Sequence, residues 1–239
     1  MRTKENDIGK MINIAIDGPA GAGKSTAAKI VSRELNIIYL DTGAMYRTVA
    51  LKAIRSGVDT KDEKALASLV KDIDIRIEYK DNEQRIFLDS TDVTELIRTP
   101  EVSIGASNVA VIPAVRLKMV ELQREIARNN DVVMDGRDIG TYVLPDAKYK
   151  FFLTASLDER AKRRYDEMIS KGMIGADLDA VRKDIEFRDK NDSSRSFAPL
   201  SKAPDAVEID TTELGPQDVA EIILKYIKNN RSDGANKCG

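Results

Sequence analysis

The sequence contains no histidine, no tryptophan and a single cysteine, Cys238, which lies one residue from the C-terminus. Without histidine, the chain can form neither a Ser-His-Asp triad nor a histidine-ligated metal site. A lone cysteine forms no internal disulfide and no cysteine-ligated zinc site. Aromatic residues make up only 5% of the chain, which argues against stacking platforms for single-stranded nucleic acid. These absences exclude histidine-based catalysis and zinc binding by cysteine clusters.

Charge and hydrophobicity exclude further classes. The 38 basic and 40 acidic residues give a formal net charge of −2, so no overall basic field attracts nucleic acid or an anionic membrane. No apolar stretch approaches the roughly 20 residues of a membrane-spanning helix, and residues 1–10 lack the apolar core of a signal peptide. We therefore expect a cytoplasmic protein with no nucleic-acid or membrane partner. Because no long apolar stripe is left without an internal use, we also expect a monomer.

Short apolar runs alternate with helical patterns along the chain. The runs typical of buried strands cover residues 12–17, 37–41, 131–136, 148–155 and 206–212. Between them, the spacing of apolar residues predicts helices over Lys24–Leu35 and Pro113–Asn130. Strands that alternate with helices predict a parallel sheet with helices on both faces, an α/β fold.

Two segments depart from this alternation. Residues 73–94 contain period-two apolar runs around the polar stretch 80–84, which predicts an antiparallel hairpin with one face in water. Residues 156–195 contain two highly charged helical patterns joined near 171–177. Such helices are either a solvated flank or a mobile lid, with Gly172 and Gly175 as hinge points.

The segment Gly18–Thr26, GPAGAGKST, matches the pattern G-x-x-x-x-G-K-[ST] between a predicted strand and a predicted helix. Glycines allow backbone N–H groups to approach phosphate oxygens, and the helix N-terminus favours the same negative charge. Lys24 would reach the β- and γ-phosphates, and the Ser25 hydroxyl can ligate Mg²⁺. The alternative, a glycine-rich turn with a surface lysine, does not explain why both flanks fit. We therefore predict a nucleoside triphosphate site.

Two more polar clusters follow predicted strands. In LDTGAMYR, Thr42 can open a helix that carries Arg47 on its first turns, although an N-cap followed by an ordinary surface arginine is an alternative. In VVMDGRDIGT, Asp135 ends a strand, and Arg137 and Asp138 follow it. Ligands of open parallel sheets bind beyond the carboxyl ends of strands, where these residues lie. A structural salt bridge among the three is the alternative.

These motifs, with the later residues RD…SR…APL, resemble bacterial-type cytidylate kinases in order and spacing, from about Met11 to Lys228. The resemblance implies a P-loop core, a nucleoside-monophosphate-binding insert and a closing lid, with flexible termini at 1–10 and 231–239. The implied core comprises about 11–41, 113–155 and 196–230, the insert about 42–112 and the lid about 156–195. It also implies that MgATP phosphorylates the small-molecule substrates CMP and dCMP.

The resemblance assigns a role to residues of each cluster. Those that would hold ATP are Gly18, Pro19, Ala20, Gly21, Ala22, Gly23, Lys24, Ser25 and Thr26. Those that would bind the acceptor nucleotide are Thr42, Arg47, Ser107, Arg116, Arg137, Asp138, Arg188 and Arg195. Among these, Arg47, Arg137 and Arg188 would surround its phosphate, and Ser107, Arg116 and Asp138 would recognise cytosine. Mg²⁺ would be held by Ser25 and Asp135, directly or through water.

Two positions depart from the family pattern. Thr42 stands where serine is frequent, so the hydroxyl is kept and a methyl group is added. Ser25 stands where many nucleoside monophosphate kinases have glycine.

Phosphoryl transfer needs dense positive charge rather than acid–base catalysis, so a protein without histidine can perform it. We expect Lys24, Arg137 and Arg188 to supply that charge. Arg160 and Arg164 share a helix face with Arg163, since the spacings are three and four, and we expect Arg160 and Arg164 to be catalytic too. The alternative pairs these arginines on the surface with Asp158, Glu159, Asp166 and Glu167.

Other functions remain open at this stage. A switch GTPase would need an N-K-x-D segment after a strand, and the chain has only NKCG from Asn236. A regulatory ATP-binding module would not need DGRD and a series of arginines. Another nucleoside monophosphate or small-molecule kinase is the nearest alternative, and the long insert before Ser107 favours the cytidylate type.

Overall fold

The computed structural model describes residues 11–80, 83–170, 172, 173, 175 and 177–231. The expectations for residues 1–10, for the segment after 231 and for Cys238 lie outside this range. So do the middle of the predicted hairpin turn and part of the stretch 171–177.

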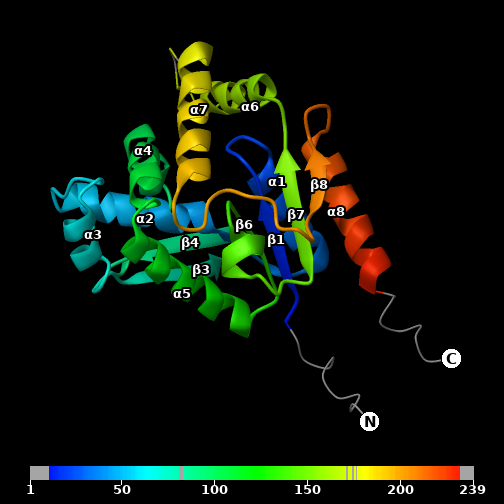
Figure 1. Cartoon of the computed structure of the whole chain (residues 1–239), viewed down its shortest axis with the longest axis horizontal. Helices are drawn as coiled ribbons and strands as arrows, with labels where there is room; N and C mark the ends of the chain where they lie inside the picture. Colours follow the sequence, from blue (N-terminus) through cyan, green and yellow to red (C-terminus); the bar gives the residue numbers. More distant parts are fainter. Residues whose placement is uncertain (1–10, 81–82, 171, 174, 176, 232–239) are drawn as a thin grey trace, which may run out of the picture.

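The centre of the molecule is a five-stranded sheet with the order β2-β6-β1-β7-β8 (Figure 1). Its strands are β1 (Asn13–Asp17), β2 (Ile38–Asp41), β6 (Val132–Gly136), β7 (Tyr149–Thr154) and β8 (Val207–Asp210). Every neighbouring pair is parallel. The strands are rich in buried Ile, Val, Leu and Phe, as expected for a sheet covered on both faces. All five predicted strands are confirmed.

Helices cover both faces of this sheet. On one face, α1 (Lys24–Leu35) and α8 (Pro216–Arg231) pack together and bury an apolar cluster that includes Ile14 and Phe151. The other face carries α2 (Thr42–Arg55) and α5 (Pro113–Asn129) over a larger cluster that includes Met45 and Met134. The predicted α/β architecture is confirmed, and the predicted bounds of α1 and α5 agree with the structure to within one residue.

Residues 42–112 form a helical and antiparallel region beside the sheet. It contains α2, α3 (Glu63–Leu69), β3 (Ile75–Lys80), β4 (Glu83–Leu88), β5 (Thr91–Asp92), the 3-10 turn η1 (Leu96–Arg98) and α4 (Pro100–Val109). The hairpin of β3 and β4 is confirmed, and β5 extends it to three strands. Its buried residues, Ile75, Ile86 and Leu88, belong to the same apolar cluster as the central sheet. This region is therefore continuous with the main core.

Two charged helices, α6 (Leu157–Ser170) and α7 (Leu178–Ser194), stand above the carboxyl ends of the strands (Figure 1). They share a small apolar cluster of Ala161, Val181 and Ile185 that also contains Ala20 of the P-loop. Residues 195–206 then cross the molecule from the foot of α7 to β8 (Figure 1). None of the helices in the described part of the chain has the length and apolar character of a membrane span.

Candidate active site

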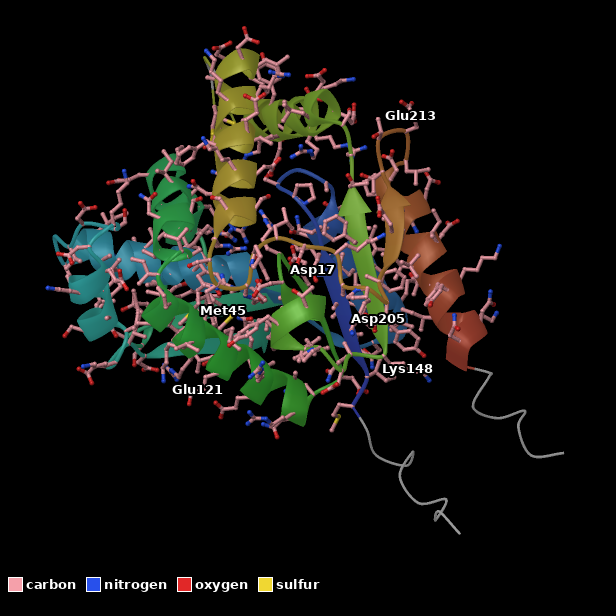
Figure 2. All side chains as sticks on the ribbon, in the orientation of Figure 1. Asp17, Met45, Glu121, Lys148, Asp205 and Glu213 are labelled. Atoms are coloured by element: carbon pink, nitrogen blue, oxygen red, sulfur yellow. The ribbon has the colours of Figure 1, made fainter. Side chains whose placement is uncertain are left out.

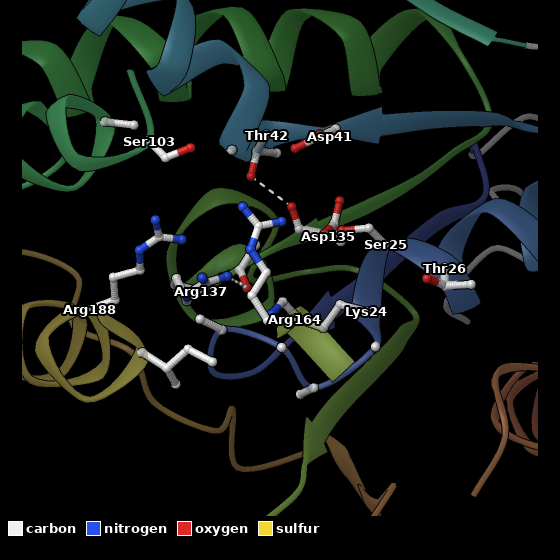
Figure 3. Close-up of a pocket in the computed structure, with 18 of the residues that line it drawn as sticks. Lys24, Ser25, Thr26, Asp41, Thr42, Ser103, Asp135, Arg137, Arg164 and Arg188 are labelled. Atoms are coloured by element: carbon white, nitrogen blue, oxygen red, sulfur yellow. Dashed lines mark hydrogen bonds between the residues drawn. The ribbon is translucent and has the colours of Figure 1, made fainter. Parts of the chain in front are cut away.

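An open cavity of about 1060 Å³ lies where the carboxyl ends of β1, β2 and β6 meet α6 and α7. It brings together most residues singled out from the sequence. Those that line it are Ala20, Gly21, Ala22, Gly23, Lys24, Ser25, Thr26, Thr42, Arg47, Ser107, Arg116, Asp135, Arg137, Asp138, Arg164, Arg188 and Arg195. Gly18, Pro19 and Arg160 are not on its wall. Figure 3 shows that Lys24, Arg137, Arg164 and Arg188 come from different segments and converge on this space.

The P-loop connects β1 to α1 through a backbone that requires glycine. Gly18, Gly21 and Gly23 have φ values of 147°, 77° and 84°, which residues with a Cβ atom rarely adopt. A Cβ at Gly18 would lie 2.0 Å from the carbonyl oxygen of Leu153 on β7. The sequence therefore specifies this loop sterically as well as chemically.

Lys24 is the first residue of α1 and is only 5% exposed. Its Nζ donates a hydrogen bond to the carbonyl oxygen of Pro19 at 2.6 Å, within the P-loop itself. Burial, together with the nearby charge of Arg137, lowers the pKa of Lys24 to about 7. An anionic ligand in the cavity would offset both effects and stabilise the ammonium form.

Asp135, at the end of β6, accepts three hydrogen bonds. The Ser25 hydroxyl donates to its Oδ2 at 2.7 Å, the Tyr39 hydroxyl donates to its Oδ1 at 2.9 Å, and Thr42 Oγ1 donates to its carbonyl oxygen at 2.7 Å. Burial raises the pKa of the Asp135 carboxyl. Tyr39 is not among the site residues predicted from the sequence, where its only signal is a hydroxyl in a run that is otherwise apolar up to Asp41.

The pair Ser25 and Asp135 fits a magnesium ion in its donor chemistry. Mg²⁺ prefers oxygen ligands and is often held by one or two carboxylates together with substrate phosphates. A hydroxyl and a carboxylate 2.7 Å apart beside the P-loop supply such donors. Among the described residues no group of three or more acidic, histidine or cysteine side chains forms a metal cage, so phosphate oxygens and water would complete the coordination.

Arg137 forms its ion pair with α7, and its Nη1 also donates to the carbonyl oxygen of Gly136 at 3.3 Å. Its Nε donates to Asp192 Oδ2 at 2.6 Å, and Asp192 also accepts from Arg195 Nε through its carbonyl oxygen at 3.1 Å. The alternative salt bridge among Asp135, Arg137 and Asp138 is therefore wrong. Asp192 was missed because nothing in the spacing indicates that α7 crosses the end of β6.

Two more arginines make this part of the cavity strongly cationic. Arg188 pairs with Asp184 at 3.1 Å, and burial lowers its pKa, as do the charges of Arg164 and Arg137. Arg47 pairs with Asp41 at 2.7 Å. Asp41, and not Thr42, caps α2 by accepting from Ala44 N, so Thr42 is free to bond Asp135.

At the end of the cavity beside α4 and α5, Arg116 pairs with Asp138. Arg116 is fully buried, and its Nη1 donates to the carbonyl oxygen of Ala110 at 3.2 Å. Burial raises the pKa of Asp138, although Arg116 opposes the shift. Ser107 on α4 lies nearby and accepts from Asn191 of α7 at 3.5 Å. A buried acceptor beside a buried donor is suited to a polar, planar ligand.

Asp17 at the end of β1 was also missed. Its two oxygens accept from the backbone N–H groups of Ile139 and Gly140, at 2.8 and 2.7 Å. It lies in the middle of the molecule (Figure 2), and burial raises its pKa to about 6. Asp17 thus ties the strand that leads into the P-loop to the turn that follows Asp138.

Arg160 and Arg164 of α6 differ in their surroundings. Arg160 is buried and donates to the carbonyl oxygens of Ala155 and Ala20, at 3.1 and 3.0 Å, and to Asp189 at 2.6 Å. Because Arg160 is not on the cavity wall, whereas Arg137, Arg164 and Arg188 are, its position differs from that expected of a catalytic residue. Arg164 lines the cavity and pairs with Glu167 at 2.8 Å, a contact that the surface alternative predicted.

Comparison with known proteins agrees with the geometry. The family model described as Cytidylate kinase matches residues 14–229. A protein named Cytidylate kinase from Pediococcus pentosaceus is 52% identical over 216 residues, which are 90% of this chain and 95% of that protein. One with the same name from Clostridioides difficile is 53% identical over 214 residues, 90% and 97% of the two chains. Among solved structures, an uncharacterized protein from Eubacterium ventriosum matches with a TM-score of 0.51 at 16% identity, covering 91% of this chain and 99% of its own. That last likeness concerns the fold alone.

Proposed function

This chain belongs to the cytidylate kinase family, and we propose that it transfers the γ-phosphoryl group of MgATP to CMP or dCMP, giving ADP and CDP or dCDP. One observation supports this most strongly. One cavity has the P-loop at one end, the buried Arg116–Asp138 pair at the other, and arginines from several segments of the chain between them. A donor triphosphate and an acceptor nucleotide can therefore lie end to end, with the reacting phosphates among the arginines.

The donor end would be organised by the P-loop. Residues 20–26, which include the end of the P-loop and the first turn of α1, line the cavity, and the N-terminus of a helix suits phosphate oxygens. Lys24 would leave the carbonyl oxygen of Pro19 and bond the β- and γ-phosphates. Ser25 and Asp135 would hold Mg²⁺, which neutralises charge on those phosphates when it is bound. The hydrogen bond between Ser25 and Asp135 already places the two oxygens on the same side of the loop.

The acceptor phosphate would lie among Arg47, Arg137 and Arg188. Each guanidinium now pairs with a carboxylate, so the arginines are held in place before the nucleotide arrives. Phosphoryl transfer depends on alignment of the acceptor and on charge stabilisation in the transition state. Two more arginines that line the cavity, Arg164 and Arg195, would lie beside the acceptor phosphate.

The base would be recognised by Asp138 and Arg116, with Ser107 beside them. The Asp138 carboxylate accepts from the N4 amino group of cytosine, as carboxylates do when they bind this base in DNA. The Arg116 guanidinium donates to N3 and O2. Uracil would present O4 and N3–H to these groups, so its hydrogen bonds would be mismatched.

We also propose that α6 and α7 act as a lid and residues 42–112 as the insert that binds the monophosphate. Closure would exclude water, which otherwise competes with the acceptor for the γ-phosphate. Gly172 and Gly175 have φ values of 76° and 91°, and a Cβ at either position would have no neighbour within 4 Å, which suits a hinge. Because the proposed donor and acceptor sites line one cavity of this chain, the reaction needs no residue from a second subunit, and we propose that the enzyme acts as a monomer.

The decisive experiment is an ADP-release assay with a panel of acceptors that includes CMP, dCMP, UMP, AMP, GMP and shikimate. We expect turnover to be highest with CMP or dCMP. The variant Lys24→Ala gives the background, because it lacks the charge that the γ-phosphate needs. Highest turnover with another acceptor would assign a different kinase activity, and ATP binding without turnover on any acceptor would indicate a regulatory or switch protein.

A further inference from the structure

The guanidinium of Arg116 is held by two aromatic rings as well as by Asp138. The ring centroids of Tyr46 and Phe197 each lie 5.8 Å from its central carbon. At this distance a cation and a ring attract one another, and more strongly when water is excluded. Arg116 is fully buried, so the contacts lie in the environment where they are strongest.

Arg116 has few other groups to fix its plane. Its two terminal nitrogens bond Asp138 and the carbonyl oxygen of Ala110, while its buried Nε has no hydrogen-bond partner among the described residues. Two such bonds leave the guanidinium able to tilt about the line between them. Rings that pack against it restrict this tilt and leave N–H groups available to a ligand.

Phe197 is itself held from several sides. Its ring meets that of Tyr142 edge-on, with centroids 4.8 Å apart and an interplanar angle of 72°. The next residue, Ala198, has φ +47°, a left-handed conformation that is uncommon for alanine and costs about 1 kcal/mol or more. Two residues further on, Leu200 N donates to the carbonyl oxygen of Asp192 at 2.8 Å. The chain therefore maintains strain next to Phe197 and anchors the segment to the end of α7.

We propose that Phe197 is a positioning residue for recognition of the base: its ring fixes the plane of Arg116 so that the guanidinium donates correctly to cytosine. The inference rests on the proposed function. It gives a role to Phe197, a residue of the segment 195–206 whose side chain has neither a charge nor a hydrogen-bonding group. Phe197 would affect the reaction only through Arg116.

The test compares Phe197→Leu with Phe197→Tyr, using kcat/KM for CMP and for UMP. Leucine keeps an apolar side chain without a ring face, whereas tyrosine keeps the ring. We expect the leucine variant to lose about 5- to 30-fold in kcat/KM for CMP, the range of a desolvated cation–π contact. UMP, which already fits Arg116 poorly, should lose less, so the CMP/UMP ratio falls. The tyrosine variant should restore the ratio.

The matched control is Phe187→Leu, the same exchange at a residue of α7 that is 49% exposed. It should leave both substrates unaffected. Equal fractional losses with CMP and UMP in Phe197→Leu, or no loss at all, would overturn the proposal, since a purely structural role lowers both together. If thermal unfolding shows that the leucine variant does not fold, Phe197→Met fills a similar volume without a ring face and gives the same comparison. Failure of the proposed function is distinguishable, because the unaltered protein would then not turn over CMP.

Discussion

Exchange of Arg160 for methionine should separate a structural role of this side chain from a catalytic one. Arg160 reaches from α6 to the carbonyl oxygen of Ala20 in the P-loop and pairs with Asp189 on α7. Asp189 in turn accepts from Ala20 N at 3.3 Å. Arg160 and Asp189 therefore bond the carbonyl oxygen and the N–H group of Ala20, and they connect α6 and α7 to the P-loop.

The size of the effect follows from the groups left behind. Methionine keeps most of the apolar volume but leaves the carbonyl oxygens of Ala20 and Ala155 without this donor and Asp189 without its charge partner. Asp189 is 22% exposed on its side chain, so water compensates for part of its loss. Loss of a largely buried ion pair with additional hydrogen bonds costs about 3–5 kcal/mol. For a domain of this size, such a loss lowers Tm by about 6–20 °C.

The assay is thermal unfolding by circular dichroism, combined with steady-state kinetics at saturating CMP. We expect Arg160→Met to lower Tm and to raise KM for ATP, because the P-loop is less well positioned. Once ATP is bound, kcat should change by less than about tenfold. The control Arg182→Met removes an arginine of α7 whose two ion pairs are solvent-exposed, and it should leave Tm nearly unchanged. An unchanged Tm with a 10²- to 10³-fold loss of kcat would refute this reasoning and make Arg160 a catalytic residue.

Two further predictions concern the charges around the phosphates. With a pKa of about 7, Lys24 is mostly neutral at pH 8, so the protein should take up a proton when ATP binds at pH 8, and ATP affinity should fall as the pH rises above 7. Calorimetry in buffers of different ionisation enthalpy measures this proton uptake. Its absence at pH 8 would contradict the lowered pKa. Arg137→Ala and Arg188→Ala should each lower turnover of CMP by about 10²- to 10³-fold while leaving the Kd for ATP largely unchanged. A selective loss of ATP binding in either variant would move that arginine to the donor end.

The fold could be predicted because its signals are local. Buried parallel strands appear as continuous apolar runs, and α1 begins where the glycine-rich loop ends. The hairpin of β3 and β4 was indicated by period-two runs around a polar turn. Each of these patterns lies within a few residues of the structure it specifies, so no knowledge of packing was needed.

Contacts between distant segments could not be predicted in the same way. Arg137 and Asp192 are 55 positions apart, and Tyr39 and Asp135 are 96 apart. The sequence indicated that Arg137 and Asp135 lie at the end of a strand, but the identity of their partners depends on how α7 and β2 are placed in space. Polar residues in ordinary surroundings, such as Asp192, carry no local signal of a role.

The arginines of α6 show what helical spacing leaves undetermined. Spacings of three and four predict that Arg160, Arg163 and Arg164 share a face, yet Arg163 and Arg164 line the cavity and Arg160 does not. The face is broad, and the P-loop meets one edge of it at Ala20. Spacing therefore indicates which side chains lie near one another, whereas the packing of α6 determines what each of them contacts.

Asp138→Asn tests the proposed recognition of the base directly. A carboxylate can only accept hydrogen bonds, and cytosine offers it the N4 amino group, whereas uracil offers the acceptor O4. Asparagine keeps the size of the side chain and an oxygen for Arg116, and it can turn its amide N–H₂ toward O4. Alanine is a poorer choice, because it would leave Arg116 as an unpaired buried charge at a cost of about 3–5 kcal/mol.

In Asp138→Asn, kcat/KM should fall for CMP and fall less, or rise, for UMP. A hydrogen-bonded contact between a side chain and a base edge discriminates by about 1–3 kcal/mol, so the CMP/UMP ratio should decrease by about 5- to 150-fold. A residue that only pairs with Arg116 would affect both substrates through the same displaced guanidinium, and the two losses would then be equal. Since Arg137 pairs with Asp192 and not with Asp138, misplacement of Arg137 would not account for a substrate-dependent change. Equal fractional losses would therefore remove Asp138 from recognition of the base and leave it as the partner of Arg116 alone.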